Sequence, residues 1–337
     1  MPEREDNVKM KNKLRNILIA VFVWSGFFPA PLTLAAEPYP TRPVRMLVPF
    51  APGGGIDFLA RVTAQELSDR LGQQFVIENQ TGGGGTIASY TLANAKPDGY
   101  TIIFQSSSSA AVVPAVSKNL RYDPIKGFAP VSLVGALPLV LVVNKDLPVT
   151  DLKSFVELLR KHPGKYSYGT AGPATAIHLV TELFRLGTDT QIQHVPYRGM
   201  NPATQDVLAG TIAMVIDAVP AQLGGINGGT VRPLAVTANK RSSVLPNVPT
   251  MQESGLKDFD FLFWGAIYAP AGTPDDIVQK LSVTIGEMMR DEKVVKRLTD
   301  VGNEPIGSTP AELDKYWKSE IELYRRIVTD AGIKLDQ

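Results

Sequence analysis

The chain has 337 residues, a formal net charge of +1 and no cysteine. The lack of cysteine excludes disulfides and thiolate metal sites, and the near-neutral charge gives no electrostatic footprint for nucleic-acid binding. We expect a chain of this length to form one large or two medium domains.

The start of the chain is typical of a secretory leader. A basic region comes first, formed by Lys9, Lys11, Lys13 and Arg15. The apolar run 17–28 that follows is shorter than the roughly 20 residues that span a bilayer. We predict a cleavable signal peptide over 1–36, ending in Ala35 and Ala36. Translation starts at Met1 or Met10, and an uncleaved anchor is the alternative. The whole chain has 34 basic and 33 acidic residues, and cleavage removes five basic and three acidic ones. The mature chain would then keep 29 basic and 30 acidic residues.

Residues 46–57 predict a buried strand, a glycine loop and the start of a helix. The apolar run 46–50 is followed by Pro52 and the glycines 53–55, and helically spaced leucines and valines come next. Glycines let the backbone approach a ligand, and the first turn of a helix offers free N–H groups to an anion. A simple turn is the alternative.

Nucleotide-binding versions of this loop do not fit the sequence. No lysine follows the glycines, as a phosphate loop requires, and Phe58 stands where a dinucleotide fingerprint needs a small residue. Asp57 is predicted to stabilise the helix dipole and to pair with Arg61, four residues on.

The next segment repeats the pattern of strand and glycine loop. It predicts strands over 74–78 and 100–104, separated by the glycines 82–85 and a helix over 87–95. The polar run that begins with Gln105 and Ser106 lies at the end of a strand. It is either the edge of a pocket or a solvated loop.

The apolar stretch 131–143 contains Pro138, which predicts a strand on each side of a break and a crossing between domains. An amphipathic helix is expected over 151–161, with Thr150 as its N-cap.

A second unit of strand, loop and helix is predicted over 166–186. Its loop, 169–175, offers small residues and the hydroxyls of Thr170 and Thr175. Two such loops in two halves of the chain indicate a cleft between domains, a common position for ligand sites. His178 and Glu182 share a helix face but have no visible third metal ligand, and no nucleophile elbow is present.

Strands are predicted over 193–196, 213–216 and 231–237, and a short helix over 203–209. Arg198 follows one of these strands, where it clamps a carboxylate or forms a surface ion pair. Asp217 ends another, where it caps the next helix or meets a donor group of a ligand.

The last part of the chain contains an aromatic stretch, 259–269, and two helix starts. Thr273 and Thr309 are the expected N-caps, the second with a capping box. Trp317 and Tyr324 are expected in the core.

Many short motifs, taken together in order, resemble the periplasmic solute-binding proteins of tripartite tricarboxylate transporters, often called Bug proteins. The resemblance covers nearly the whole mature chain, and its main motifs are Pro49–Asp57, Ala60–Arg61, Pro97–Thr101, Tyr122–Pro124, Tyr168–Thr170, Glu182–Phe184, Val195–Gly199 and Ala269–Pro274.

The resemblance implies an α/β fold of two lobes, a type II-like clam shell with strands crossing between the lobes. Residues 37–139 and 262–337 would form the first lobe, and 140–261 the second. It also implies that two loops hold a ligand carboxylate by backbone N–H groups, hydroxyls and water. The implied ligand-binding residues are Phe50, Pro52, Gly53, Gly54, Gly55, Gln105, Ser106, Thr170, Ala174, Thr175, Arg198 and Asp217. The family usually has glycine where Ala174 stands, which alters the backbone approach in the second loop.

The expected function is therefore that of a monomeric periplasmic receptor that delivers a small carboxylate to the permease subunits of such a transporter. No cofactor, metal or nucleic acid is expected. A ligand sensor for a membrane signalling partner is one alternative. An α/β enzyme is the other, and it would need a nucleophile elbow or an acidic ribose partner, neither of which is found.

Overall fold

A computed structural model describes residues 39–173, 175–257 and 259–332, and Pro40–Gln337 forms one compact unit. The expected signal peptide, 1–36, lies outside the described residues. The strands are β1 Val44–Val48, β2 Phe75–Asn79, β3 Thr101–Ser106, β4 Phe128–Asn144, β5 Ser167–Thr170, β6 Gln193–Pro196, β7 Met214–Ala218, β8 Val231–Val236, β9 Leu262–Pro270 and β10 Glu304–Pro305. The α-helices are α2 Gly55–Leu71, α3 Thr86–Ala93, α4 Val113–Val116, α5 Leu152–Lys161, α6 Ala176–Thr188, α7 Met200–Leu208, α8 Val219–Asn227, α9 Asp275–Met288, α10 Glu292–Thr299 and α11 Pro310–Asp330. The 3-10 helix η1, Gly83–Gly85, and the π-helix η2, Ser108–Val112, complete the described elements.

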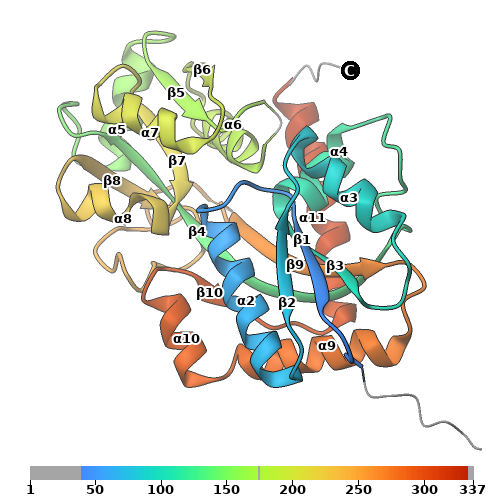
Figure 1. Ribbon diagram of the computed structural model, residues 1–337. Helices are drawn as coiled ribbons and strands as arrows, with labels where there is room; N and C mark the ends of the chain where they lie inside the picture. The colour runs from blue at the N-terminus through green and yellow to red at the C-terminus, as the bar shows by residue number, and fades with distance from the viewer. Residues whose placement is uncertain (1–38, 174, 258, 333–337) are drawn as a thin grey trace, which may run out of the picture. The chain divides into compact units, whose positions relative to one another are not determined.

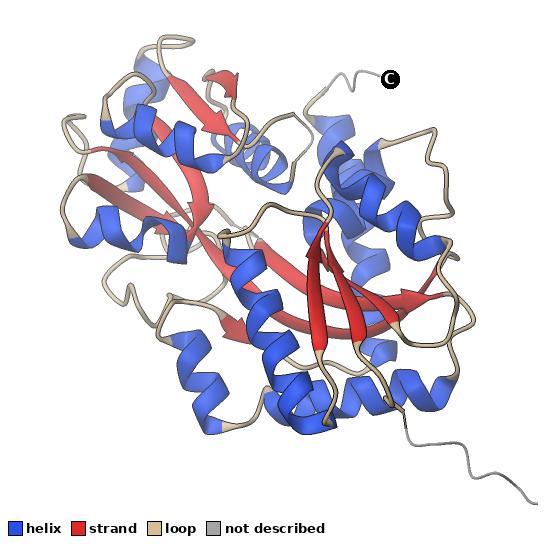
Figure 2. Cartoon of the chain, viewed as in Figure 1, coloured by secondary structure: helices blue, strands red, loops and turns tan. Residues whose placement is uncertain are grey.

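The strands form one hydrogen-bonded system in the order β2-β1-β3-β9-β4-β7-β5-β6, with β8 and β10 also paired to β4 (Figures 1 and 2). On one side, β1 is parallel to both β2 and β3. On the other side, β5 is parallel to both β6 and β7. Helices alternate with these strands along the chain, so the predicted α/β fold with a strand crossing between two sheets is confirmed.

The strand β4 joins the two sheets. It is continuous through Pro138, so the break that the sequence predicts there is wrong. Pro138 pairs with Leu262 of β9, whereas the next residue, Leu139, pairs with Ala218 of β7. A proline cannot donate a ladder hydrogen bond, and it is tolerated here because the partner strands change at this point. The predicted lobe boundary at 139/140 coincides with this change, but the division into lobes stays a prediction.

Apolar side chains that point to the helices form the core. The helix α2 packs on β2, β9 and α9, and its Leu59, Val62 and Leu67 are fully buried (Figure 1). Trp317 and Tyr324 of α11 are also buried, as predicted. Each such side chain stabilises the fold by about 1.5–3 kcal/mol relative to an exposed one.

Two predicted helix caps are wrong and one is confirmed. Asp151, and not Thr150, is the N-cap of α5, because its carboxylate accepts from the Ser154 N–H in a capping box. The N-cap of α9 is Pro274, while the Thr273 hydroxyl donates to the carbonyl of Pro270. Thr309 caps α11 with the predicted capping box.

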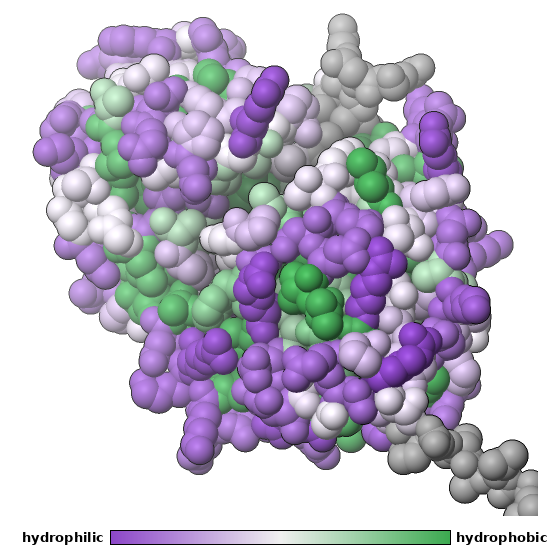
Figure 3. Space-filling model, viewed as in Figure 1, coloured by the Kyte–Doolittle hydropathy of each residue, from purple (hydrophilic) through white to green (hydrophobic). Residues whose placement is uncertain are grey.

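Hydrophilic residues cover most of the face shown in Figure 3, with a small apolar patch over the edge strand β2, where Val76 is 53% exposed. In the part of the chain that the structure describes, no helix combines the length and the apolar character needed to cross a bilayer.

Candidate functional site

The topology places the predicted ligand loops at the carboxyl ends of parallel strands. The loops after β1 and β3 leave the same edge of one sheet, because these strands are parallel neighbours. The loops after β5, β6 and β7 likewise leave one edge of the second sheet. In open α/β sheets, ligands bind in the crevice outside this edge.

The first loop leads into α2, as predicted. Pro52, Gly53 and Gly54 are exposed, and the helix begins at Gly55. Gly53 has a φ of +94°, which favours glycine. The N-cap residue Gly54 makes no side-chain hydrogen bond to the helix. The first turn of α2 therefore presents backbone N–H groups without a side-chain cap to this end of the sheet.

Asp57 fixes the shape of the first loop. Its buried carboxylate accepts from the Gly53 N–H at 3.0 Å, from Arg61 Nε at 2.7 Å and from Asn79 Nδ2 at 2.9 Å. Asn79 also donates to the carbonyl of Phe50 at 2.8 Å. Burial alone would raise the pKa of Asp57, but the hydrogen bonds from Arg61, Gly53 and Asn79 together lower it.

This arrangement confirms the predicted ion pair of Asp57 and Arg61 and adds Asn79, which sequence reasoning missed. It also occupies the Gly53 N–H, which leaves the amides of the α2 first turn as the ones presented to an anion. The predicted ligand residue Phe50 is partly buried.

The predicted residues Gln105 and Ser106 are the last two residues of β3, and both are buried. Ser106 is fully buried and its hydroxyl accepts from the Ser108 N–H at 3.2 Å. Gln105 is 1% exposed, and its Oε1 has no hydrogen-bond partner among the described residues. An unpaired buried amide oxygen is costly, and a donor group of a ligand or a water molecule would relieve that cost.

The second loop is shaped by its own threonines. Thr175 is the N-cap of α6: its hydroxyl accepts from the His178 N–H and donates to the Gly172 carbonyl at 3.0 Å. The Thr170 hydroxyl is fully buried and lies 3.2 Å from the Gly172 nitrogen. The structure thus shows both hydroxyls in structural roles, and their contact with a ligand stays a prediction. Ala174 lies outside the described residues.

One hydrogen bond joins the two halves of the candidate site. The N–H of Ala176, the first residue of α6, donates to the hydroxyl of Ser108, the first residue of η2, at 3.2 Å. Gly85 lies close to this point, since a Cβ placed on it would lie 2.6 Å from Ser109 and 3.2 Å from Pro49. The loops after β1, β3 and β5 are therefore neighbours. Ser108 belongs to the polar run that the sequence left open as a pocket edge or a solvated loop, but its partner could not be predicted because the bond spans 68 residues.

Arg198 and Asp217 lie at the ends of strands of the second sheet. Arg198 is exposed after β6 and makes no ion pair or side-chain hydrogen bond among the described residues, so the surface pair that the sequence left open is not formed there. Asp217 is buried; it accepts from the Ala218 N–H at 2.8 Å and from Gln222 Nε2 at 2.9 Å. The N-cap of α8 is Ala218, so Asp217 reaches that helix through the side chain of Gln222.

Burial raises the pKa of Asp217 to about 6, although its two hydrogen bonds act to lower it. Because this value lies above the ordinary value of 3.8, the stabilising contribution of the carboxyl is complete below about pH 3.8 and is lost as the pH rises through 6. Asp217→Asn leaves one of the two donors, Ala218 N–H or Gln222 Nε2, without an acceptor oxygen at any pH. Relative to the unchanged protein, we therefore expect the variant to gain about 1–3 kcal/mol in stability between pH 4 and pH 8. Thermal unfolding at both pH values measures this, and a difference from the unchanged protein that is equal at both would contradict it.

His178 and Glu182, which share a helix face as two metal ligands would, have other partners. The carboxylate of Glu182 accepts from the Tyr168 hydroxyl and pairs with Arg185 at 2.8 Å, and the ring of His178 stacks on His194. Among the described residues, no group of three or more histidine, aspartate or glutamate side chains is placed to hold a metal ion.

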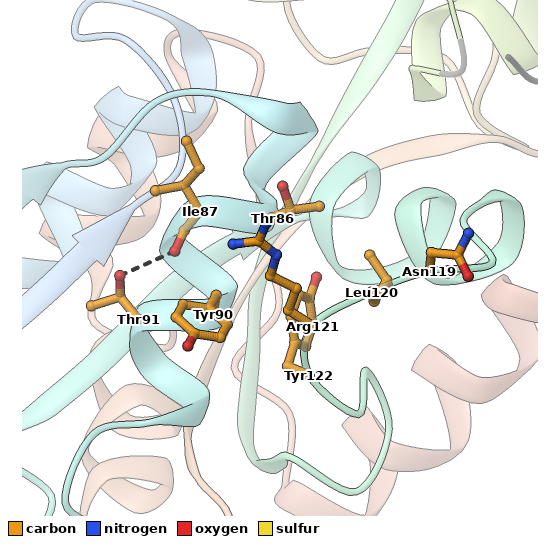
Figure 4. Close-up of a pocket in the computed structure, with 8 residues that line it drawn as sticks. All are labelled: Thr86, Ile87, Tyr90, Thr91, Asn119, Leu120, Arg121 and Tyr122. Carbon is orange, nitrogen blue, oxygen red and sulfur yellow. Dashed lines mark hydrogen bonds between the residues drawn. The ribbon is translucent and has the colours of Figure 1, made fainter. Parts of the chain in front are cut away.

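A pocket of about 400 Å³ lies elsewhere, between α3 and the segment 119–122. Figure 4 shows Ile87 and Tyr90 on one side and Arg121 and Tyr122 on the other. None of the predicted ligand-binding residues lines it.

Comparisons with known proteins give a consistent picture. The model of the family described as "Tripartite tricarboxylate transporter family receptor" matches residues 59–333. Protein BugT of Bordetella pertussis is 37% identical over 319 residues, covering 94% of this chain and 97% of that protein. The structure of R. palustris Rpa4515 with adipate has a TM-score of 0.82 and 36% identity, over 88% of this chain and 99% of the other. MatC from Rhodopseudomonas palustris with bound malate has a TM-score of 0.76 and 32% identity, over 86% and 100%.

Proposed function

This chain belongs to the tripartite tricarboxylate transporter receptor family, and we propose that it is a periplasmic receptor that captures a small carboxylate for a transporter of that kind. The observation that supports this best is the meeting of two helix starts. The uncapped first turn of α2 and the start of α6 lie at neighbouring loops, joined by the bond from Ala176 to Ser108.

A carboxylate is the ligand chemistry that fits these groups. One helix start contributes only about 0.3–1 kcal/mol toward an anion, so a useful affinity needs both starts and the exclusion of water. Two structural relatives have adipate or malate bound, and both are carboxylates. We infer that the ligand is a small mono- or dicarboxylate.

The proposed ligand contacts divide into three groups. The amides of Gly54 and Gly55 and the Ile177 N–H of α6 hold one carboxylate. The neighbouring Ala176 and His178 N–H groups donate to Ser108 and Thr175 instead. The amide of Gln105 supplies a polar partner for the rest of the ligand, and Arg198 neutralises a second anionic group. Thr170 and Thr175 shape the second loop, and Asp217 meets a donor group of the ligand or acts only through Gln222.

The mode of action follows from the fold. A ligand that contacts loops of both sheets would draw the two proposed lobes together, with β4 as a connection between them. The protein would act as a monomer without cofactor or catalysis, exported through the signal peptide 1–36, and pass its ligand to membrane permease subunits. A role as a sensor for a membrane signalling partner would use the same site.

Arg198→Gln should weaken the binding of a dicarboxylate about tenfold, roughly 1.4 kcal/mol. The guanidinium is exposed, so its loss removes a charge from the site without disturbing the core. Calorimetric titration with adipate or malate at low salt measures the change. The matched control is Arg326→Gln, which removes an exposed arginine from α11. Equal affinities for the two variants would contradict the role of Arg198.

A further inference from the structure

A stack of three rings adjoins the second loop: Tyr168 of β5, His178 of α6 and His194 of β6. The rings of His178 and His194 lie 4.1 Å apart at 13°, and those of Tyr168 and His194 lie 5.0 Å apart at 17°. The strand β5 leads into the second loop and the helix α6 leaves it. The orientation of the His194 ring is therefore fixed by the two elements that bound the loop.

The Nε2 atom of His194 lies 2.7 Å from the Thr170 hydroxyl, which is fully buried. The same hydroxyl accepts from the Gly172 N–H at 3.2 Å. The Gly172 carbonyl in turn accepts from Thr175, the N-cap of α6. A short chain of hydrogen bonds thus runs from His194 through Thr170 to the backbone of the second loop. Gly172 has a φ of +125°, a conformation that glycine adopts far more readily than other residues.

Burial keeps both imidazoles of the ring stack neutral near pH 7. Burial lowers the pKa of His194, with Glu182 opposing that effect. Burial and then repulsion from His194 lower the pKa of His178 to about 4. Glu182, on α6, is itself held by Tyr168 and Arg185. A neutral imidazole forms one directional bond through Nε2, and either tautomer satisfies the Thr170 hydroxyl.

We propose that His194 is a positioning residue of the carboxylate site: its Nε2 orients the Thr170 hydroxyl, which holds the Gly172 amide and so the backbone of the second loop. This inference rests on the proposed function, because the second loop is a ligand loop only if the carboxylate site is correct. His194 does not touch the ligand; it acts through Thr170.

Two substitutions separate the hydrogen bond from the packing. His194→Phe keeps a flat ring in the stack but has no nitrogen, whereas His194→Gln loses the ring and places an amide within reach of Thr170. We expect His194→Phe to raise the exchange rate of the Gly172 amide proton about tenfold and to weaken adipate binding by a similar factor. In His194→Gln, both the exchange rate of the Gly172 amide and the affinity for adipate should stay closer to those of the unchanged protein.

The control is His162→Phe, the same change at a histidine outside the ring stack. The His162 ring meets the edge of the Tyr166 ring, with the two centroids 6.4 Å apart. The route through the hydroxyl is tested by Thr170→Val, which removes the hydroxyl and keeps the shape. In that background, His194→Phe should have no further effect on the exchange of the Gly172 amide.

The experiment combines amide exchange measured by nuclear magnetic resonance without ligand and calorimetric titration with adipate. An unchanged exchange rate of the Gly172 amide in His194→Phe would overturn the proposal. The proposal would also be overturned if His194→Phe raised that rate as much in the Thr170→Val background as it does alone. If the exchange pattern holds but the unchanged protein fails to bind any carboxylate, the positioning of the loop is supported and the proposed function is what fails.

Discussion

Gly54→Val should lower the affinity for the carboxylate at least tenfold, roughly 1.4 kcal/mol, while the fold survives. Gly54 is the N-cap of α2, with φ of −81° and ψ of 166°, an extended conformation that valine adopts readily. A Cβ at this position meets nothing within 4 Å. The valine side chain therefore enters the open space where a carboxylate would approach the first turn of the helix.

The neighbouring glycine does not give so clean a test. A Cβ on Gly55 would lie 2.6 Å from Cδ2 of the buried Leu137, so Gly55→Val disturbs the core as well as the loop. Gly224→Val is the matched control for Gly54→Val. A Cβ on Gly224 also meets nothing within 4 Å, and the residue lies in α8, away from the first loop. Calorimetric titration with adipate or malate and thermal unfolding of both variants give the result. If Gly54→Val binds as tightly as Gly224→Val, the first loop is only a turn.

Asp57→Asn should destabilise the protein by about 2–3 kcal/mol and weaken ligand binding as well. An amide has one acceptor oxygen where the carboxylate has two, so it leaves at least one of the donors on Gly53, Arg61 and Asn79 unsatisfied. The ligand effect follows because the same carboxylate fixes the backbone before the first turn of α2.

The loss of stability in Asp57→Asn should depend on pH. The lowered pKa of Asp57 means that its contribution is present above its unfolded value, about 3.9, and is lost as the pH falls through the folded value. Thermal unfolding should therefore show a larger difference from the unchanged protein at pH 7 than at pH 3. Asp69→Asn is the matched control, because Asp69 is exposed on the same helix and, in the part of the chain that the structure describes, accepts a hydrogen bond only from Gln65. Equal effects of the two substitutions would show that Asp57 does not fix the loop.

Local signals in the sequence predicted the parts of the site that depend on neighbouring residues. The unit of strand, glycine loop and helix at 46–57 was predicted by apolar runs and glycines, and the pair of Asp57 and Arg61 by their spacing on a helix. Thr175 is the N-cap of α6 because it stands directly before the first residue of that helix. The sequence pattern had instead suggested that its hydroxyl contacts a ligand.

Features that depend on residues far apart in the chain could not be predicted. Asn79 reaches Asp57 across 22 residues, and His194 reaches Thr170 across 24, because parallel strands bring them together. The continuity of β4 through Pro138 depends on where β9 gives way to β7 as its partner. No local pattern encodes which strands will pair at a given residue, so a proline was a misleading sign of a break there.

The central claim is that this receptor recognises a carboxylate by its charge and its oxygens. The most direct measurement is a calorimetric titration of the protein with short mono- and dicarboxylates, including adipate and malate, each matched with the amide of the same carbon skeleton. The amide keeps the shape of the acid but replaces an acceptor oxygen with a donor, which the N–H groups at the starts of α2 and α6 cannot bind. We expect at least one acid to bind, with its amide at least tenfold weaker. Equal binding of an acid and its amide, or the absence of binding by every acid, would contradict the claim.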